Sequence, residues 1–153
     1  MHRLISLGAF LAICAGCVPG PMRTREPAFL PREDWPPNLI DFLWHHTEIA
    51  DATEVYGHDA FFATKLMIQI NANESELAQF ISEKELVASD RNHPKLKELR
   101  TGLPESWSLP NQREIEYYAT KDYGVEHIEG TSLVLLVKER SSGRAVGIYE
   151  WIF

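Results

Sequence analysis

The chain has 153 residues, which suits one folded domain and a short additional segment. Its hydrophobic fraction of 44% and charged fraction of 24% are ordinary for a soluble globular domain. The net charge of −7 argues against nucleic acid as a partner, because a phosphate-binding surface needs clustered lysine and arginine.

Residues 1–16 have the pattern of a secretory signal peptide. A positive start at Arg3 is followed by an apolar run from Leu4 to Cys14 and by two small residues before Cys17. The run is too short to span a bilayer, which takes about 20 apolar residues. We therefore expect the segment to be an export signal that is removed from the mature protein.

The sequence Cys14-Ala15-Gly16-Cys17 resembles the lipobox of bacterial lipoproteins. In that family the cysteine is diacylated, the signal is cut just before it, and the new amino group is often acylated as well. The resemblance implies lipidation at Cys17. It departs from the family pattern at Cys14, where Leu is usual, but a cut before Cys14 would leave the bulky Ile13 at the cleavage position. An ordinary cleaved signal followed by a coincidental cysteine is the other interpretation.

The same resemblance implies a lipid-anchored protein of the bacterial cell envelope that faces the periplasm. Val18 stands where an Asp commonly keeps such lipoproteins at the inner membrane, which favours the outer membrane in a diderm host. Both cysteines lie before Val18, so the mature body has no thiol nucleophile. Removal of the signal leaves 14 basic and 22 acidic side chains. Anionic lipid repels an acidic body, so we expect two or three acyl chains to supply membrane binding.

Residues 17–34 are predicted to form the lipidated N-terminus and a proline-rich tether, with a single domain from 35 to 153. Residues 18–37 contain six of the nine prolines, too many for a helix or a central strand. An extended tether from Val18 to Pro31 would hold the domain up to about 40 Å from the bilayer. Packing of Phe29, Leu30 and Trp35 onto the body is the alternative, which we expect for Trp35.

The body is predicted to begin with a helix whose first turn holds Pro36 and Pro37. Its apolar stripe comprises Leu39, Phe42, Leu43 and His46, widened by Ile40 and Trp44. Two strands follow, at Thr53–Gly57 and Phe61–Ile70. Asn73 and Glu76 then have the spacing of a capping box, which predicts a second helix. The buried stripe of that helix comprises Leu77, Phe80 and Ile81.

Residues 87–112 are polar and interrupted by prolines, so we expect one short helix near Pro94–Leu99 and a long excursion that contains Trp107. A strand is predicted at Glu114–Thr120. The segment from Thr131 to Phe153 consists of two runs rich in β-branched and aromatic residues around a Ser-Ser-Gly turn. This terminal hairpin is predicted to be the centre of the sheet, with its last apolar residues buried.

Two loop lengths are possible for the hairpin. A three-residue loop would place Arg140 opposite Arg144, and like charges that face each other are unfavourable. A four-residue loop ending at a left-handed Gly143 instead pairs apolar residues, so we prefer it. Its predicted pairs are Glu139 with Arg144, Val137 with Val146 and Leu135 with Ile148. The other face then carries Val134, Leu136, Tyr149, Trp151 and Phe153.

The order of these elements predicts an α+β fold, with a mostly antiparallel sheet of about five strands and two or three helices on one face. The arrangement resembles the small uncharacterised α+β domains often found on bacterial lipoproteins.

A cluster of imidazole and carboxylate groups is the first candidate for chemistry, because such ligands suit zinc and similar metals. Its spacing is poor: His45 and His46 are adjacent, so on a helix they diverge by about 100°. We therefore predict no metal and no cofactor, with His46, His58 and Asp59 as the candidate ligands if a metal does bind. The full cluster comprises His45, His46, Asp51, Glu54, His58 and Asp59.

Glu114 and Glu116 lie on the same face of a predicted strand, which is typical of a solvated face and not of a catalytic acid pair. Aromatic residues could instead line a groove for a peptide or a glycan, although most are expected in the core. Trp107 is the one that we expect to be exposed, and so the candidate partner-binding residue. The aromatic set comprises Trp44, Trp107, Tyr117, Tyr118, Tyr149 and Trp151.

The sequence contains none of the glycine-rich, nucleophile or zinc-protease signatures of known enzyme classes. Its leading interpretation is a lipid-anchored binding or structural module for a protein or other cell-envelope partner, and not an enzyme. The alternative is a lipid-anchored hydrolase or metal-dependent enzyme that uses the histidine cluster. The first predicts an exposed apolar or aromatic patch, and the second requires three of the cluster residues to converge.

Overall fold

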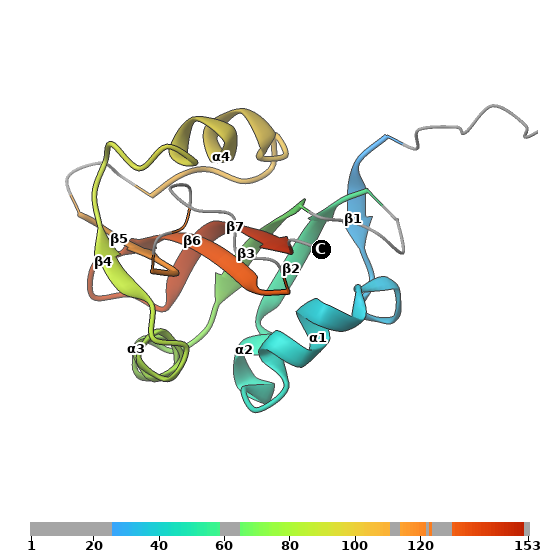
Figure 1. The fold of residues 1–153 in the computed structure, drawn as a ribbon, viewed down its shortest axis with the longest axis horizontal. Coiled ribbons are helices and arrows are strands. Elements are labelled where there is room, and N and C mark those ends of the chain that lie inside the picture. Colours follow the sequence, from blue (N-terminus) through green and yellow to red (C-terminus); the bar gives the residue numbers. More distant parts are fainter. Residues whose placement is uncertain (1–25, 59–64, 111–113, 122, 124–129, 152–153) are drawn as a thin grey trace, which may run out of the picture.

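A computed structural model of the chain describes residues 26–58, 65–110, 114–121, 123 and 130–151. These residues form one antiparallel sheet of seven strands in the order β1-β2-β3-β7-β6-β5-β4 (Figure 1). The strands are β1 (Ala28–Leu30), β2 (Thr53–Gly57), β3 (Lys65–Asn71), β4 (Val87–Ser89), β5 (Ile115–Ala119), β6 (Ser132–Glu139) and β7 (Arg144–Trp151). The helices are α1 (Pro37–Leu43), α2 (Thr47–Asp51), α3 (Glu74–Glu83) and α4 (Leu96–Gly102), preceded by a 3-10 turn, η1 (Arg32–Asp34).

The terminal hairpin lies at the centre of the sheet, as predicted, with β7 paired to β3 and β6 paired to β5. Within the hairpin, Val137 pairs with Val146 and Leu135 with Ile148, which confirms the four-residue loop. Phe153 and residues 61–64 of the predicted second strand lie outside the described residues. The α+β class is confirmed, but the sheet has seven strands and not about five.

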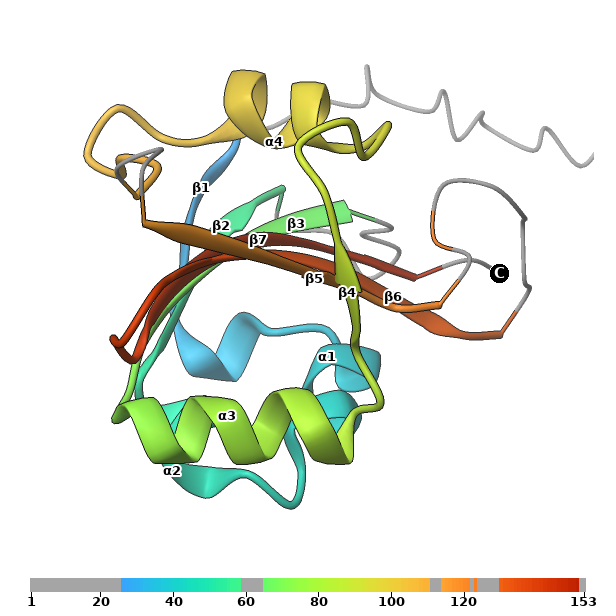
Figure 2. The ribbon, with the colours of Figure 1, turned by 90° about the vertical axis from the view of Figure 1, so that its left-hand side faces the viewer.

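Helices cover both faces of the sheet, so the prediction of helices on one face is wrong. Figure 2 shows α1, α2 and α3 on one face and α4 on the other. The cause is the hairpin itself, because adjacent residues of one strand point to opposite faces and both sets are apolar. The α1–α3 side buries Leu39, Leu77, Phe80, Val134, Leu136 and Tyr149. The α4 side buries Leu96, Leu99, Leu135, Val137 and Ile148.

The helix starts follow their sequence signals. Pro37 occupies the first turn of α1, and the capping box of Asn73 and Glu76 begins α3. In contrast, the first helix ends at Leu43, earlier than the predicted stripe through His46. The chain turns there and begins α2 at Thr47.

The two edge strands were not predicted. Each has only three residues, and β1 lies within the predicted tether, between Pro27 and Pro31. Proline is tolerated on an edge strand because its missing N–H can face solvent. Residues 28–34 therefore belong to the fold, although we expected the domain to begin at residue 35. The indole of Trp35 donates a hydrogen bond to the carbonyl of Leu30 at 3.1 Å and so ties β1 to the body.

The hairpin turn differs from the prediction in one respect. Ser141 has the positive φ of 55°, and Gly143 does not have a positive φ. Glycine is needed at 143 for a different reason, since a Cβ there would lie 1.7 Å from the carbonyl oxygen of Ala72. Gly143 also accepts a hydrogen bond from the Ala72 backbone N–H at 3.1 Å. The turn therefore packs directly on the segment that leads into α3.

Replacement of Ile148 by Ala should lower the free energy of unfolding by about 2–5 kcal/mol, because Ile148 is completely buried. Ser142→Ala should cost only about 0.5–1.5 kcal/mol, the usual worth of a hydrogen bond. The Ser142 hydroxyl accepts a hydrogen bond from the Arg144 N–H at 2.9 Å. Urea denaturation of full-chain variants measures both changes. If Ile148→Ala proved the milder one, β7 would be peripheral and this fold would be contradicted.

Candidate functional site

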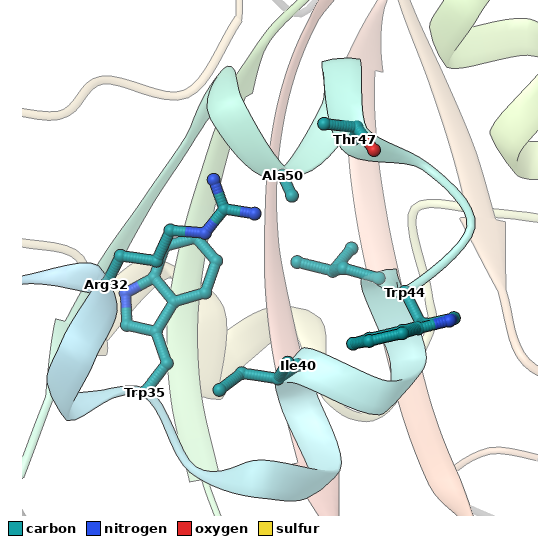
Figure 3. A pocket seen from close by; sticks show the side chains of 7 residues that line it. Arg32, Trp35, Ile40, Trp44, Thr47 and Ala50 are labelled. Atoms are coloured by element: carbon teal, nitrogen blue, oxygen red, sulfur yellow. The ribbon is translucent and has the colours of Figure 1, made fainter.

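An apolar pocket of about 290 Å³ lies between η1, α1 and α2 (Figure 3). Figure 3 shows Arg32 and Trp35 on one side of this pocket and Trp44 on the other, with Ile40 between them. The lining residues are Arg32, Trp35, Ile40, Leu43, Trp44, Thr47 and Ala50.

The pocket exists because α1 is apolar on two faces. Leu39 and Leu43 are buried against the sheet. Ile40 and Trp44, four residues apart and so on one face of the chain's helical path, are 37% and 67% exposed. Trp44 is the most exposed large hydrophobic side chain in the part of the chain that the structure describes. An exposed tryptophan beside an apolar pocket is not explained by the packing of the core.

The opposite wall of the pocket consists of a buried tryptophan and one cation. Trp35 is buried and its indole is held by the carbonyl of Leu30. The guanidinium of Arg32 lies 5.9 Å from the centroid of the Trp35 ring and forms an ion pair with Asp51. Because Arg32 comes from η1 and Asp51 from α2, this pair links the two segments that border the pocket.

A second, more open pocket of about 630 Å³ adjoins the first and shares Arg32, Trp35 and Ala50 with it. It extends along β1 and β2, where its lining includes Phe29, Thr53 and Glu54. We call the two pockets together the α1–β1 groove.

The border of the α1–β1 groove is acidic. Residues 32–54 contain six carboxylates and, among lysine and arginine, only Arg32. Five of the carboxylates are adjacent in sequence to a residue that lines the first pocket, and all five are exposed. These five are Glu33, Asp34, Asp41, Glu48 and Asp51.

The candidate metal ligands that the structure describes do not converge on one site. His46 is only 8% exposed and packs against Phe80, with ring centroids 5.0 Å apart. Burial lowers the pKa of His46, and the neighbouring Lys84 lowers it further. Its Nε2 lies 3.5 Å from a carboxylate oxygen of Glu83, so the ring is part of the packing between α1, α2 and α3.

The other members of the cluster lie in different surroundings. Asp51 pairs with Arg32, and Glu54 accepts hydrogen bonds from Gln69 and Trp107. His45 and His58 are exposed, and Asp59 lies outside the described residues. Among the residues that are described, no three His, Cys, Asp or Glu side chains are placed to hold a metal ion.

The two glutamates near β5 do not form a catalytic pair. Glu116 lies 3.4 Å from Lys138 Nζ and 3.6 Å from Arg140 Nε, and it also accepts from the Tyr118 hydroxyl. Glu114 is exposed at the start of the strand. The partners of Glu116 are therefore two cations and a hydroxyl, and not a second carboxylate across a cleft.

A second cluster of charged groups joins α4 to the sheet. Glu150 lies 3.1 Å from Lys95 Nζ and 3.5 Å from Lys65 Nζ, and the Tyr123 hydroxyl donates to it at 2.9 Å. Burial raises the pKa of Tyr123, and a hydrogen bond from Lys65 lowers the pKa of Glu98. Because Glu98 and Glu150 both pair with lysines, this cluster fits a structural link between α4 and the sheet better than general acid–base catalysis.

The expectation that Trp107 is exposed is wrong, because only 7% of this residue is accessible. Its indole donates to Glu54 at 3.2 Å and its ring contacts Phe29 and Tyr56 edge-on. The exposed tryptophan is Trp44, which the apolar pattern had placed on the buried stripe. Trp44 lies four residues after Ile40, on the side of the helical path away from Leu39. This spacing was the sequence feature from which the exposure of Trp44 could have been predicted.

Comparison with protein-family models, curated proteins and solved structures finds no match for this chain. No helix in the described part of the chain is long and apolar enough to cross a membrane.

Proposed function

We propose that this chain is a lipid-anchored binding module of the bacterial cell envelope, and that it holds a protein partner in the α1–β1 groove. The observation that carries the proposal is the 67% exposure of Trp44 beside an apolar pocket. Tryptophan is enriched among the residues that dominate binding energies, because it buries a large area and carries a polar N–H.

The anchor is Cys17, which the lipobox-like junction supports. The described fold begins with β1 at Ala28, so residues 18–27 connect the anchor to the sheet. At roughly 3.1 Å per residue, an extended segment of this length reaches about 30 Å. The groove includes Phe29 and Leu30 of β1, so the connecting segment joins the domain beside the groove. A partner in the envelope would therefore meet the groove near the membrane surface.

The alternative, a hydrolase or metal-dependent enzyme, receives no support from a specific observation. It requires three of the His and Asp cluster residues to converge, and the described members are used in packing or ion pairs or lie exposed. Because the first pocket is lined mainly by apolar side chains, its chemistry suits binding better than acid–base catalysis.

A photo-crosslinking phenylalanine analogue in place of Trp44 should capture an envelope protein in intact cells, because the side chain at this position would contact the partner. The same analogue in place of Val87 is the matched control, since Val87 is also apolar and exposed but lies on the far edge strand. Immunoblotting and mass spectrometry identify the adducts. No adduct from position 44, or equal adducts from both positions, would contradict the proposed function.

Replacement of Cys17 by Ser should abolish acylation and leave the signal uncut before residue 17, because serine cannot form the thioether of a lipid anchor. Labelled palmitate and the intact mass report both effects. Cys14→Ser is the control and should leave acylation unchanged. Retention of palmitate label by the Cys17→Ser variant would show that the anchor is elsewhere.

A further inference from the structure

The segments that form the α1–β1 groove carry more negative charge than the described residues around them neutralise. Among the described residues, Glu33, Asp34 and Glu48 form no ion pair, and the one local cation, Arg32, is already paired with Asp51. The segments that form the apolar pocket, η1, α1 and α2, therefore carry an excess of negative charge.

The size of the pocket selects the kind of group that it can hold. About 290 Å³ is at the lower limit of small-molecule sites and is large enough for one or two apolar side chains. In protein interfaces, an anchor side chain fills such a pocket and a polar border excludes water around it. Ile40 and Trp44 would close over an inserted side chain from one side and Trp35 from the other (Figure 3).

We propose that the occupant of the groove is a basic segment of a protein partner, in which an apolar or aromatic side chain enters the pocket and flanking Lys or Arg residues pair with Glu33, Asp34 and Glu48. This inference rests on the proposed function, because it names the chemistry of the partner that the groove binds. Complementary charge would speed association and fix the register of the segment more than it would add affinity.

Two other occupants fit the charge less well. A second copy of this chain related by a two-fold axis would bring the same acidic border against itself. An anionic lipid surface would also be repelled by these carboxylates, and that repulsion acts within a Debye length of about 10 Å. A basic segment is the occupant that uses both the apolar pocket and the carboxylates.

The first experiment selects binders without assuming their sequence. The full mature lipidated chain, in a zwitterionic detergent, is presented to a displayed library of random peptides about twelve residues long, and Trp44→Ala is selected in parallel. We expect the peptides enriched only by the native chain to carry an aromatic or aliphatic residue between Lys or Arg residues. Enriched neutral or acidic peptides, or no enrichment that depends on Trp44, would overturn the proposal.

The second experiment measures the enriched peptide by fluorescence anisotropy. Trp44→Ala should weaken binding about 30-fold or more, as for a central interface residue. Glu48→Gln should weaken it about 1.4- to 5-fold and reduce its salt dependence, as for one exposed ion pair. Glu114→Gln is the matched control, because Glu114 is exposed just before β5, which is separated from β1 and β2 by three other strands of the sheet. Equal effects of the two glutamine variants would overturn the charge assignment.

Two further readouts address the other occupants. A Trp44-dependent dimer in sedimentation would assign the groove to a second copy and overturn the proposal. Quenching of Trp44 by brominated lipids in vesicles, judged against Trp44→Phe, would assign it to the membrane and overturn it as well. Failure here can be separated from failure of the proposed function, since crosslinking from position 44 to a protein does not depend on the charge of the bound segment.

Discussion

The fold depends on the antiparallel pairing of β6 and β7, whose side chains are apolar on both faces. The register that places Leu135 opposite Ile148 directs these residues to one face, and it sends Val134 and Tyr149 to the other. Neither face can remain in water, so helices are needed on both. The close approach of Gly143 to Ala72 also packs the hairpin turn on the segment that leads into α3.

The helices on the two faces cover the apolar side chains of the sheet in different ways. α4 is short and is reinforced by the pairing of Lys95 with Glu150 on β7. On the other face, α1 buries Leu39 and Leu43, whereas Ile40 and the residue that follows the helix, Trp44, stay exposed. The apolar pocket is thus a consequence of a helix that carries more apolar side chains than the sheet can bury. This excess, within an acidic surface, is the physical basis of the binding role proposed for the groove.

The features that were predicted correctly from the sequence are those that depend on residues close together in the chain. The capping box of α3 and the hairpin register depend on residues close in the chain, and both are confirmed. The edge strand β1 could not be predicted, because its three residues are ordered by pairing with β2, more than 20 positions away. The burial of Trp107 has the same origin, since its contacts are Phe29 and Glu54. Trp44 was misassigned because the apolar pattern of α1 is wider than its buried face.

In the proposal made here, the buried face of the α1 segment serves folding and its exposed face serves binding. The most direct test is the free energy of unfolding of two variants of this helical segment, measured by urea denaturation of the full chain. Leu39→Ala should cost about 2–5 kcal/mol because Leu39 is completely buried. Trp44→Ala should change the stability by no more than about 0.5 kcal/mol, as for an ordinary surface substitution. A loss on Trp44→Ala as large as that on Leu39→Ala would show that Trp44 serves the fold, and would contradict this account.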